Sequence, residues 1–446
     1  MKRILNSLAL AALATACGEP SNTSNSTSSS GATTQQGVSC DGDVCVLTGT
    51  LLDNLTLTAD KQWLLRGGVF VGNDVSPVTL TIQPGTRIYG ETSTNGMLVV
   101  TRGSRLQADG TASSPIIFTS SKTDGTRARG DWGGLIINGR APINGCTAGS
   151  TCEGFGEGGT GYYGGTDAAD NSGTLRYVRI EFAGRLISPE NELNGLALQG
   201  VGTGTTLDFI QIHMGKDDCI EFFGGTVNAK HILCTGIADD NLDWTDGWNG
   251  KLQFFVAQQY EDAGDNGIEG DNNAEANATT PRSHPVLSNL TLIGQAASEQ
   301  SDLGILLREG TAANIHNAIV LGFNEACLDV DHTETFTNAL SGTTLTGELT
   351  IENSILSCAT NFKVDSGEPM DLETFYNLNG GNALADPGLA SPFDLLAPNF
   401  RPMAGGAAMT MTVNVPNDPF FSPVTFRGGV DPNDDWTAGW TTSARN

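Results

Sequence analysis

Alternating apolar and polar residues recur three times in the middle of the chain, and each copy ends on an acidic residue. The three copies are residues 207–225 (LDFIQIHMGKDDCIEFFGG), 231–250 (HILCTGIADDNLDWTDGWNG) and 252–271 (LQFFVAQQYEDAGDNGIEGD). Aligning them places Glu221, Asp243 and Glu269 in one column, 22 and then 26 residues apart. The copies contain short strands and turns, with no 3.6-residue periodicity long enough for a helix. This repeat predicts a parallel β-solenoid, whose units bury their apolar faces by stacking.

Weaker copies of the pattern continue on both sides of this centre. Residues 46–140 and 285–367 alternate short apolar strands with turns, many of them containing glycine. We therefore predict a single all-β domain over residues 37–378. From about residue 379 the periodicity stops, and we expect residues 379–446 to form an irregular cap over the open end of the solenoid.

The first 36 residues predict export and attachment to a membrane. Residues 1–17 hold two basic residues, an apolar segment and small residues before Cys17, as a secretory signal does. The ending LATAC resembles a bacterial lipobox, in which the cysteine is lipidated; ordinary cleavage that leaves Cys17 as a free thiol is the alternative. Residues 18–36, rich in Ser, Thr and Asn, predict a flexible tether. Because Gly18, and not a retaining Asp, follows Cys17, we expect a lipid anchor in the outer membrane, on its periplasmic face or at the cell surface.

The chain is strongly acidic. It has 23 Lys and Arg residues against 50 Asp and Glu residues, a formal net charge of −27. This field repels nucleic acid and favours cations or basic partners, so no nucleic-acid partner is expected. After the signal, no apolar stretch is long enough to predict a membrane-spanning helix.

Cysteine usage fits an exported protein with disulfides. Nine cysteines minus Cys17 leave an even number, which favours disulfide bonds outside the cytosol. The short separations within the pairs Cys40/Cys45 and Cys146/Cys152 predict two local bridges. Pairing among the other four stays open, namely Cys219, Cys234, Cys327 and Cys358.

Several phrases of the sequence carry a family resemblance. They include LTIQPGTRIYG, GDWGGLIINGRAP, DDCIEFFGGTVNAKHI, LDWTDGWNGKLQFFV and the terminal FRGGVDPNDDWTAGWT. These phrases are similar to those of secreted right-handed parallel β-helix proteins of the pectin-lyase-like superfold, among them leptospiral outer-membrane lipoproteins. The resemblance covers about residues 45–446 and implies a single-stranded right-handed parallel β-helix. It implies little about activity, because most members are uncharacterised.

The aligned acids suggest a calcium site. Apolar residues flank each acid in IEFF, LDW and IEGD, so a strand that points Ile220 and Phe222 inward points Glu221 outward. Stacked carboxylates repel one another and need compensation, and Ca²⁺ accepts many oxygen ligands in irregular geometry. The candidate ligands are Asp218, Glu221, Asp240, Asp243, Glu269 and Asp271. Solvated acids on an acidic protein, without a ligand, are the alternative.

A catalytic interpretation uses some of the same residues. The stretch GKDDC resembles the G-D-D-C of polygalacturonases, with Asp217, Asp218 and Glu221 as candidate acids, but Lys216 interrupts the motif and the other signatures of those enzymes are absent. A lyase would need an Arg or Lys base. Four basic residues are available, namely Arg179, Lys230, Lys251 and Arg308.

Trp244 and Trp248, in DWTDGW, are candidates for stacking on a sugar, with packing inside a loop as the alternative. Together these patterns predict a lipid-anchored β-helix that acts as a binding or structural module for a surface glycan or protein ligand, with calcium as its candidate cofactor. A polysaccharide hydrolase or lyase is the alternative.

Overall fold

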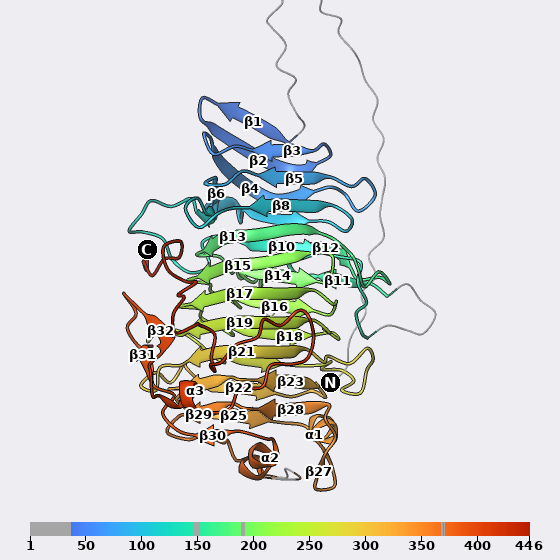
Figure 1. The fold of residues 1–446 in the computed structure, drawn as a ribbon. Coiled ribbons are helices and arrows are strands. Elements are labelled where there is room, and N and C mark those ends of the chain that lie inside the picture. The colour runs from blue at the N-terminus through green and yellow to red at the C-terminus, as the bar shows by residue number, and fades with distance from the viewer. Residues whose placement is uncertain (1–36, 146–151, 189–191, 367–368, 370) are drawn as a thin grey trace, which may run out of the picture. The chain divides into compact units, whose positions relative to one another are not determined.

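The computed structural model describes residues 37–145, 152–188, 192–366, 369 and 371–446 (Figure 1). The signal sequence, Cys17, the tether and Cys146 lie outside these residues, so their predictions are not tested. Gln35–Asn446 form one compact unit. Within it, 26 strands form one continuous sheet whose successive coils pair in parallel, which confirms the predicted parallel β-helix. No helix in the described ranges is long and apolar enough to cross a membrane.

Strand pairing divides each coil into three faces. The first face comprises β3 (Leu55–Leu57), β5 (Thr79–Ile82), β8 (Arg105–Asp109), the first halves of β13 (Gly173–Glu181), β15 (Thr206–His213), β17 (Asn228–Thr235), β19 (Lys251–Gln258) and β21 (Val286–Ile293), then β23 (Ala313–His316) and β28 (Leu349–Glu352). The second face comprises the first parts of β2 (Val44–Leu51) and β4 (Gln62–Val71), β6 (Arg87–Gly90), β9 (Ile116–Ser120), the second halves of the five long strands, β24 (Ile319–Leu321), β29 (Ile355–Ser357) and β30 (Ala383–Leu384).

The third face carries the candidate site. It comprises the ends of β2 and β4, then β7 (Met97–Val100), β10 (Gly134–Asn138), β14 (Leu196–Gln199), β16 (Ile220–Phe223), β18 (Leu242–Thr245), β20 (Ile268–Gly270), β22 (Leu303–Leu307) and β25 (Ala326–Val330). Short antiparallel additions are β1 (Val38–Asp41) on β2, β11 (Gly154–Gly156) with β12 (Gly161–Tyr163), β26 (Leu340–Ser341) with β27 (Thr344–Leu345), and β31 (Leu389–Ser391) with β32 (Asn399–Pro402).

One apolar core runs through the coils. Alternate residues of each strand point inward, so Ile220, Leu242 and Ile268 lie one above the other in the core. In the neighbouring inward row Phe222 pairs with Trp244, and Trp244 with Gly270. A side chain at Gly270 would collide with the Trp244 ring, since a Cβ there would lie 2.3 Å from that ring. The alternation that the sequence predicts therefore fixes which residues face outward.

The five long strands bend at the corner between the first and second faces. Each bend is a residue with positive φ, between 48° and 65°: Tyr177, Phe209, His231, Phe254 and Asn289. The first four form a stack, here called the corner stack, with ring centroids 4.5, 4.2 and 4.9 Å apart in successive pairs. A bulky residue with positive φ is unusual, and here the stacking of rings in adjacent coils accompanies it.

Three short helices and the end of the chain differ from the prediction. The helices are α1 (Thr333–Ala339), α2 (Leu372–Leu378) and α3 (Ala407–Thr410), where none was expected. Residues 403–446, here called the C-terminal segment, do not cap the end but run along the side of the long strands (Figure 1). Side-chain amides hold this segment: those of Gln211, Gln253 and Asn317 each bond both the N–H and the C=O of one segment residue, respectively Thr442, Ser422 and Asn414.

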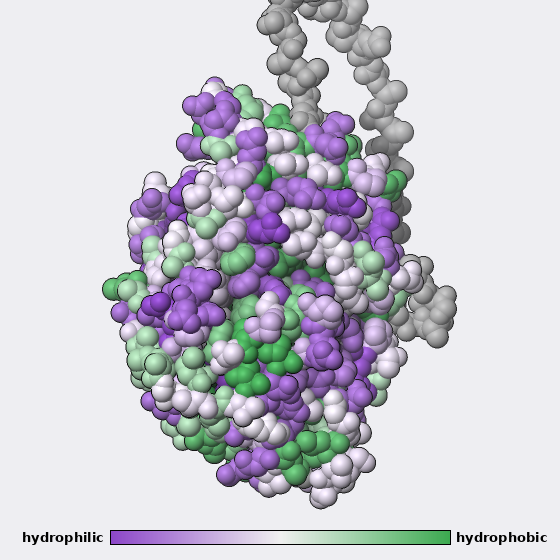
Figure 2. All heavy atoms as spheres, viewed as in Figure 1, coloured by the Kyte–Doolittle hydropathy of each residue, from purple (hydrophilic) through white to green (hydrophobic). Residues whose placement is uncertain are grey.

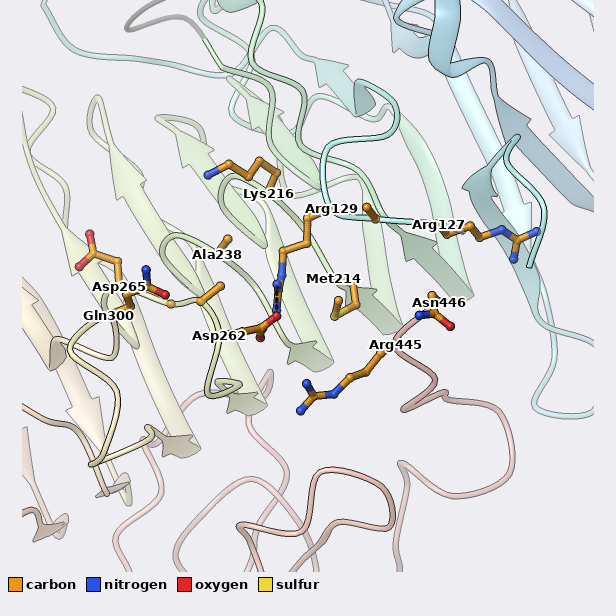
Figure 3. A pocket seen from close by; sticks show the side chains of 13 residues that line it. Arg127, Arg129, Met214, Lys216, Ala238, Asp262, Asp265, Gln300, Arg445 and Asn446 are labelled. Carbon is orange, nitrogen blue, oxygen red and sulfur yellow. Dashed lines mark hydrogen bonds and ion pairs between the residues drawn. The ribbon is translucent and has the colours of Figure 1, made fainter. Parts of the chain in front are cut away.

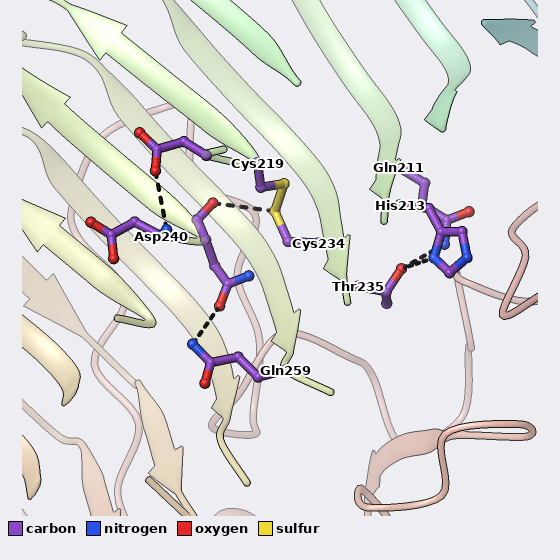
Figure 4. The surroundings of a disulfide bond; sticks show 9 residues. Gln211, His213, Cys219, Cys234, Thr235, Asp240 and Gln259 are labelled. Atoms are coloured by element: carbon purple, nitrogen blue, oxygen red, sulfur yellow. Dashed lines mark hydrogen bonds between the residues drawn. A yellow bond between two sulfur atoms is a disulfide. The ribbon is translucent and has the colours of Figure 1, made fainter. Parts of the chain in front are cut away.

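Disulfides join neighbouring parts of the β-helix. The predicted bridge Cys40–Cys45 is confirmed. The other predicted local bridge, Cys146–Cys152, is not tested, because Cys146 lies outside the described residues. The pairing that the sequence left open is Cys219–Cys234 and Cys327–Cys358. Cys219–Cys234, with its Cα atoms 5.9 Å apart, ties the residue after Asp218 to the next coil (Figure 4).

Candidate functional site

The predicted acidic column exists in register. Glu221 on β16 pairs with Asp243 on β18, and Asp243 with Glu269 on β20. All three point away from the apolar core, as the alternation predicted. Glu221 is nevertheless only 9% exposed, so the column lies in a cleft and not on an open solvated surface.

A second row, just before these strands, is held by the backbone of the following coil. The Asp240 N–H donates to Asp218 Oδ1 (3.0 Å), and the Asn266 N–H donates to Asp240 Oδ1 (2.7 Å). Each of these contacts joins residues one coil apart, 22 and 26 residues in sequence. Asp218 and Asp240 are 8% and 5% exposed, so both carboxylates are fixed and largely shielded from water.

A third acidic row completes the cleft, and the sequence analysis missed most of it. Asp217, Asp239 and Asp265 line the same cavity, which has a volume of about 1010 Å³. Glu157 and Glu192, from segments before β14, line it too, and the Asn194 amide donates to Glu221. The repeated acidic pairs at 217–218 and 239–240 were a signal for the third row, whereas nothing local marked the two glutamates.

Four overlapping sets of three carboxylates lie close enough to share a cation. Within each set, one oxygen per residue lies within 4.8 Å of the others. The sets are Asp218/Glu221/Asp243, Asp240/Asp243/Glu269, Asp218/Asp239/Asp240 and Glu192/Asp217/Asp239. Asp243 belongs to two of them, and its Oδ1 is buried with no hydrogen-bond partner among the described residues. These distances suit a divalent cation bound by several oxygens.

Burial and mutual repulsion raise the pKa values throughout the cleft. Burial is the larger cause and neighbouring carboxylates the next, and together they hold the pKa values of Asp218, Glu221, Asp240 and Asp243 well above their ordinary range. Burial likewise raises the pKa of Asp217 to about 8. Burial also raises the pKa values of Asp265 and Glu269 to about 7. The cleft therefore accepts a full set of negative charges only at a cost in free energy.

Among the described residues that line the cleft, Arg308 is the single basic one. Its guanidinium contacts Glu269, and its Nε lies 3.1 Å from Asp271 Oδ1. Asp271, a candidate calcium ligand, is thus held by Arg308 and belongs to none of the four carboxylate sets.

The other three candidate bases lie elsewhere, on the side covered by the C-terminal segment. Arg179 donates to the Trp440 carbonyl, Lys230 to Ser422, and Lys251 pairs with Asp418.

The two tryptophans proposed for sugar stacking are not available to a ligand. Trp244 and Trp248 are fully buried in the core, where Trp248 stacks on Phe222 with centroids 3.9 Å apart. Trp244 lies on β18 and points inward, opposite to Asp243. The prediction that these tryptophans stack on a sugar is therefore wrong, and the alternative, packing inside the protein, is the better description.

A second hollow of about 610 Å³ lies beyond the third acidic row and shares Asp265 with the cleft (Figure 3). Its arginines are already paired: Arg129 with Asp262 at 2.9 and 3.0 Å, and likewise Arg127 with Asp124 and Arg445 with Glu261. Because these guanidinium charges are balanced, this hollow is a weaker candidate site than the cleft.

Fold and cleft together define the class: a parallel β-helix protein whose third face carries a buried cluster of carboxylates. The model of a family described as pectate-lyase-like β-helix domain matches residues 49–441. The chain belongs to this family. Comparisons with curated proteins and with solved structures give no match.

Proposed function

We propose that this protein is a calcium-loaded binding module whose acidic cleft is its functional site. One observation carries the proposal: four overlapping sets of carboxylates, each within 4.8 Å, line a cleft that has a single arginine to balance them. Strand register holds the acids one coil apart, so they cannot move away from one another without breaking the sheet. A bound cation relieves this repulsion.

Calcium suits the cleft better than other common cations. Two carboxylates about 5 Å apart repel by roughly 1 kcal/mol or more near a protein surface, and by more when buried. Ca²⁺ takes six to eight oxygens in flexible geometry, whereas Mg²⁺ requires a near-ideal octahedron. The donors are carboxylate oxygens, without the His or Cys ligands that zinc prefers.

The rest of the cavity leaves room for a ligand. A volume of about 1010 Å³ is larger than a few calcium ions require. Calcium held at its walls keeps coordination positions for oxygen atoms of a ligand, which favours an acidic surface glycan or an acidic protein segment. This protein's own charge repels such a ligand until the cations are bound.

We place the module at the outer membrane, attached through a lipid on Cys17. Support comes from the sequence alone: the signal-like residues 1–17, the lipobox-like ending and the polar tether. Labelling with a radioactive fatty acid, compared between the wild type and Cys17→Ala, tests the anchor directly. Absence of label in the wild type contradicts it.

An enzymatic role, as polysaccharide hydrolase or lyase, is the alternative that one observation favours. Asp217, with a pKa raised to about 8, has the protonation state that a general acid needs at neutral pH. Against a lyase, two carboxylates hold the Arg308 guanidinium protonated and raise its pKa, so Arg308 is a poor base. Against a hydrolase, the catalytic carboxylates of such enzymes lie roughly 5 to 9.5 Å apart. The acids of this cleft lie closer together, as a shared cation requires.

Calcium titration and polymer turnover test both proposals on the same samples. Isothermal titration calorimetry of chelator-treated protein is expected to show calcium binding that the double variant Asp218→Asn/Glu221→Gln loses and the exposed control Glu299→Gln keeps. Wild type that binds no calcium contradicts the binding module. New reducing ends from a panel of acidic polysaccharides, lost in the double variant, would instead establish the enzyme.

A further inference from the structure

Another cavity, distinct from the acidic cleft and from the hollow beside it, lies between the corner stack and the C-terminal segment. It has a volume of about 430 Å³, within the range of small-molecule sites, and shares no residue with the acidic cleft. Its floor is the corner stack. Trp436 and Trp440 form another wall, at interplanar angles of 66° to 88° to the stacked rings that they contact. Aromatic rings in two orientations thus surround one space.

Figure 2 shows the face that the C-terminal segment crosses in Figure 1. This face is hollowed near its middle, with hydrophobic residues gathered beside the hollow and hydrophilic residues around them.

The charge of this cavity is entirely negative. Asp431, Asp434 and Asp435 line it, and no lysine or arginine does. Asp431 and Asp435 accept backbone N–H bonds from Asn433 and Thr437 in their own turns. Asp434 is exposed and, among the described residues, accepts no hydrogen bond and forms no ion pair. Within the part of the chain that the structure describes, none of the three aspartates forms an ion pair.

Basic residues close to the cavity are already engaged. Lys230 donates to Ser422 and lies 4.9 Å from the Phe420 ring centroid, and Arg176 pairs with Asp109. His231, on the floor, contacts the Asp208 carboxylate at 2.7 Å. The cavity therefore offers negative charge and aromatic surface together.

We propose that this cavity binds a small organic cation, a substituted ammonium group whose carbon atoms pack against the rings while its charge lies near Asp434. The corner-stack rings cover one another's faces, so the cation gains chiefly from Trp436 and Trp440 and from the carboxylates. An inorganic ion fits less well, since none of the three aspartates belongs to a carboxylate set within 4.8 Å. An anion is disfavoured by the aspartates themselves.

Tetramethylammonium and tert-butanol form a matched pair of probes, similar in shape and different in charge. Ligand-observed NMR of the purified protein is expected to show saturable binding of tetramethylammonium and none of tert-butanol. Trp436→Leu should weaken this binding by about three- to thirtyfold, the range of cation–aromatic interactions, and Trp436→Phe should retain most of it. Asp434→Asn should weaken it most at low salt, and Glu299→Gln should not.

Each other outcome overturns the proposal. No saturable binding of tetramethylammonium removes the site. Equal binding of tert-butanol makes it a neutral apolar pocket, and equal losses in Asp434→Asn and Glu299→Gln reduce it to the general attraction of an acidic protein. Thermal unfolding of Trp436→Leu and Trp436→Phe, measured by circular dichroism, shows that both are folded before their affinities are compared. Because this cavity shares no lining residue with the acidic cleft, the result is independent of whether the cleft binds calcium.

Discussion

The coils between residues 207 and 271 place similar side chains one above another on two sides of the β-helix. One stack is unfavourable in free energy and the other is favourable. On the third face, Glu221, Asp243 and Glu269 lie one above the other and repel. At the corner, the rings of Phe209 and His231 lie 4.2 Å apart and attract. Both arrangements come from the same backbone register. A parallel β-helix thus places equivalent side chains one coil apart whatever their chemistry, and a stack that repels marks the position that needs a ligand.

The corner should carry the larger share of stability. Trp440 is 2% exposed and packs against Tyr177 with ring centroids 5.5 Å apart. Trp440→Ala should lower the free energy of unfolding by about 3 to 5 kcal/mol, because it leaves a cavity beside the corner stack. Urea unfolding measures this, and calcium affinity in the same variant should stay unchanged. A loss of calcium affinity would mean that the two sides are coupled and the comparison fails.

The third face should carry the affinity for calcium. Asp243 belongs to two carboxylate sets, so Asp243→Asn should weaken calcium binding by about 100-fold. In chelator the same variant should be at least as stable as the wild type, because one repelling charge has gone. Calorimetry and thermal unfolding, with Glu299→Gln as control, check both parts. A variant that is less stable without calcium would contradict the idea of an unfavourable stack.

The acidic cleft should also make the stability of the protein depend on pH, which the aromatic corner should not. The folded-state pKa values of cleft acids are raised, to about 7 for Glu269 and about 8 for Asp217. Protonation of these acids therefore stabilises the folded state. With chelator present, their contribution to the free energy of unfolding should be complete below about pH 4 to 5 and should be lost as the pH rises through about 7 and 8. Calcium should remove this fall. Melting temperatures measured from pH 5 to 9 with and without calcium test it, and a metal-free protein that gains stability with pH would contradict it.

The smallest effect is expected where amides hold the C-terminal segment. Gln253→Ala removes the partner of both the N–H and the C=O of Ser422, at a cost of about 1 kcal/mol or slightly more. Hydrogen exchange at the Ser422 amide should speed up, whereas Gln300→Ala, at an exposed position, should change nothing. Unchanged exchange in Gln253→Ala would show that the segment does not depend on these contacts.

The register of the site was readable from the sequence because stacking preserves spacing. The alignment of Glu221, Asp243 and Glu269 is the pairing that the structure has. The degree to which these acids are buried could not be read from the sequence. Burial of these acids depends on walls that come from other segments, such as Glu157 and Glu192, and no local pattern announces those.

Other errors have an equally physical origin. Trp244 alternates inward like any strand residue, but the aspartates and Gly247 that surround it in DWTDGW suggested a ligand-binding loop. The C-terminal segment was assigned to the end of the β-helix because it lacks periodicity. Its true position follows from single amide side chains such as Gln211, whose partner in the segment is 231 residues away. Contacts of that length leave no trace in a single sequence.

Those distant contacts also set an order of events during synthesis. In the parallel sheet each strand pairs only with strands of the neighbouring coils, so coils can form as the chain emerges, beginning at the N-terminus. The amide contacts of the C-terminal segment span 97 to 231 residues and involve the last part to be made, so they form late. The corner stack remains uncovered until then. A chain truncated before residue 403 should therefore build its coils yet keep a row of aromatic rings exposed to solvent, so the last residues to be made are those that hide this apolar surface.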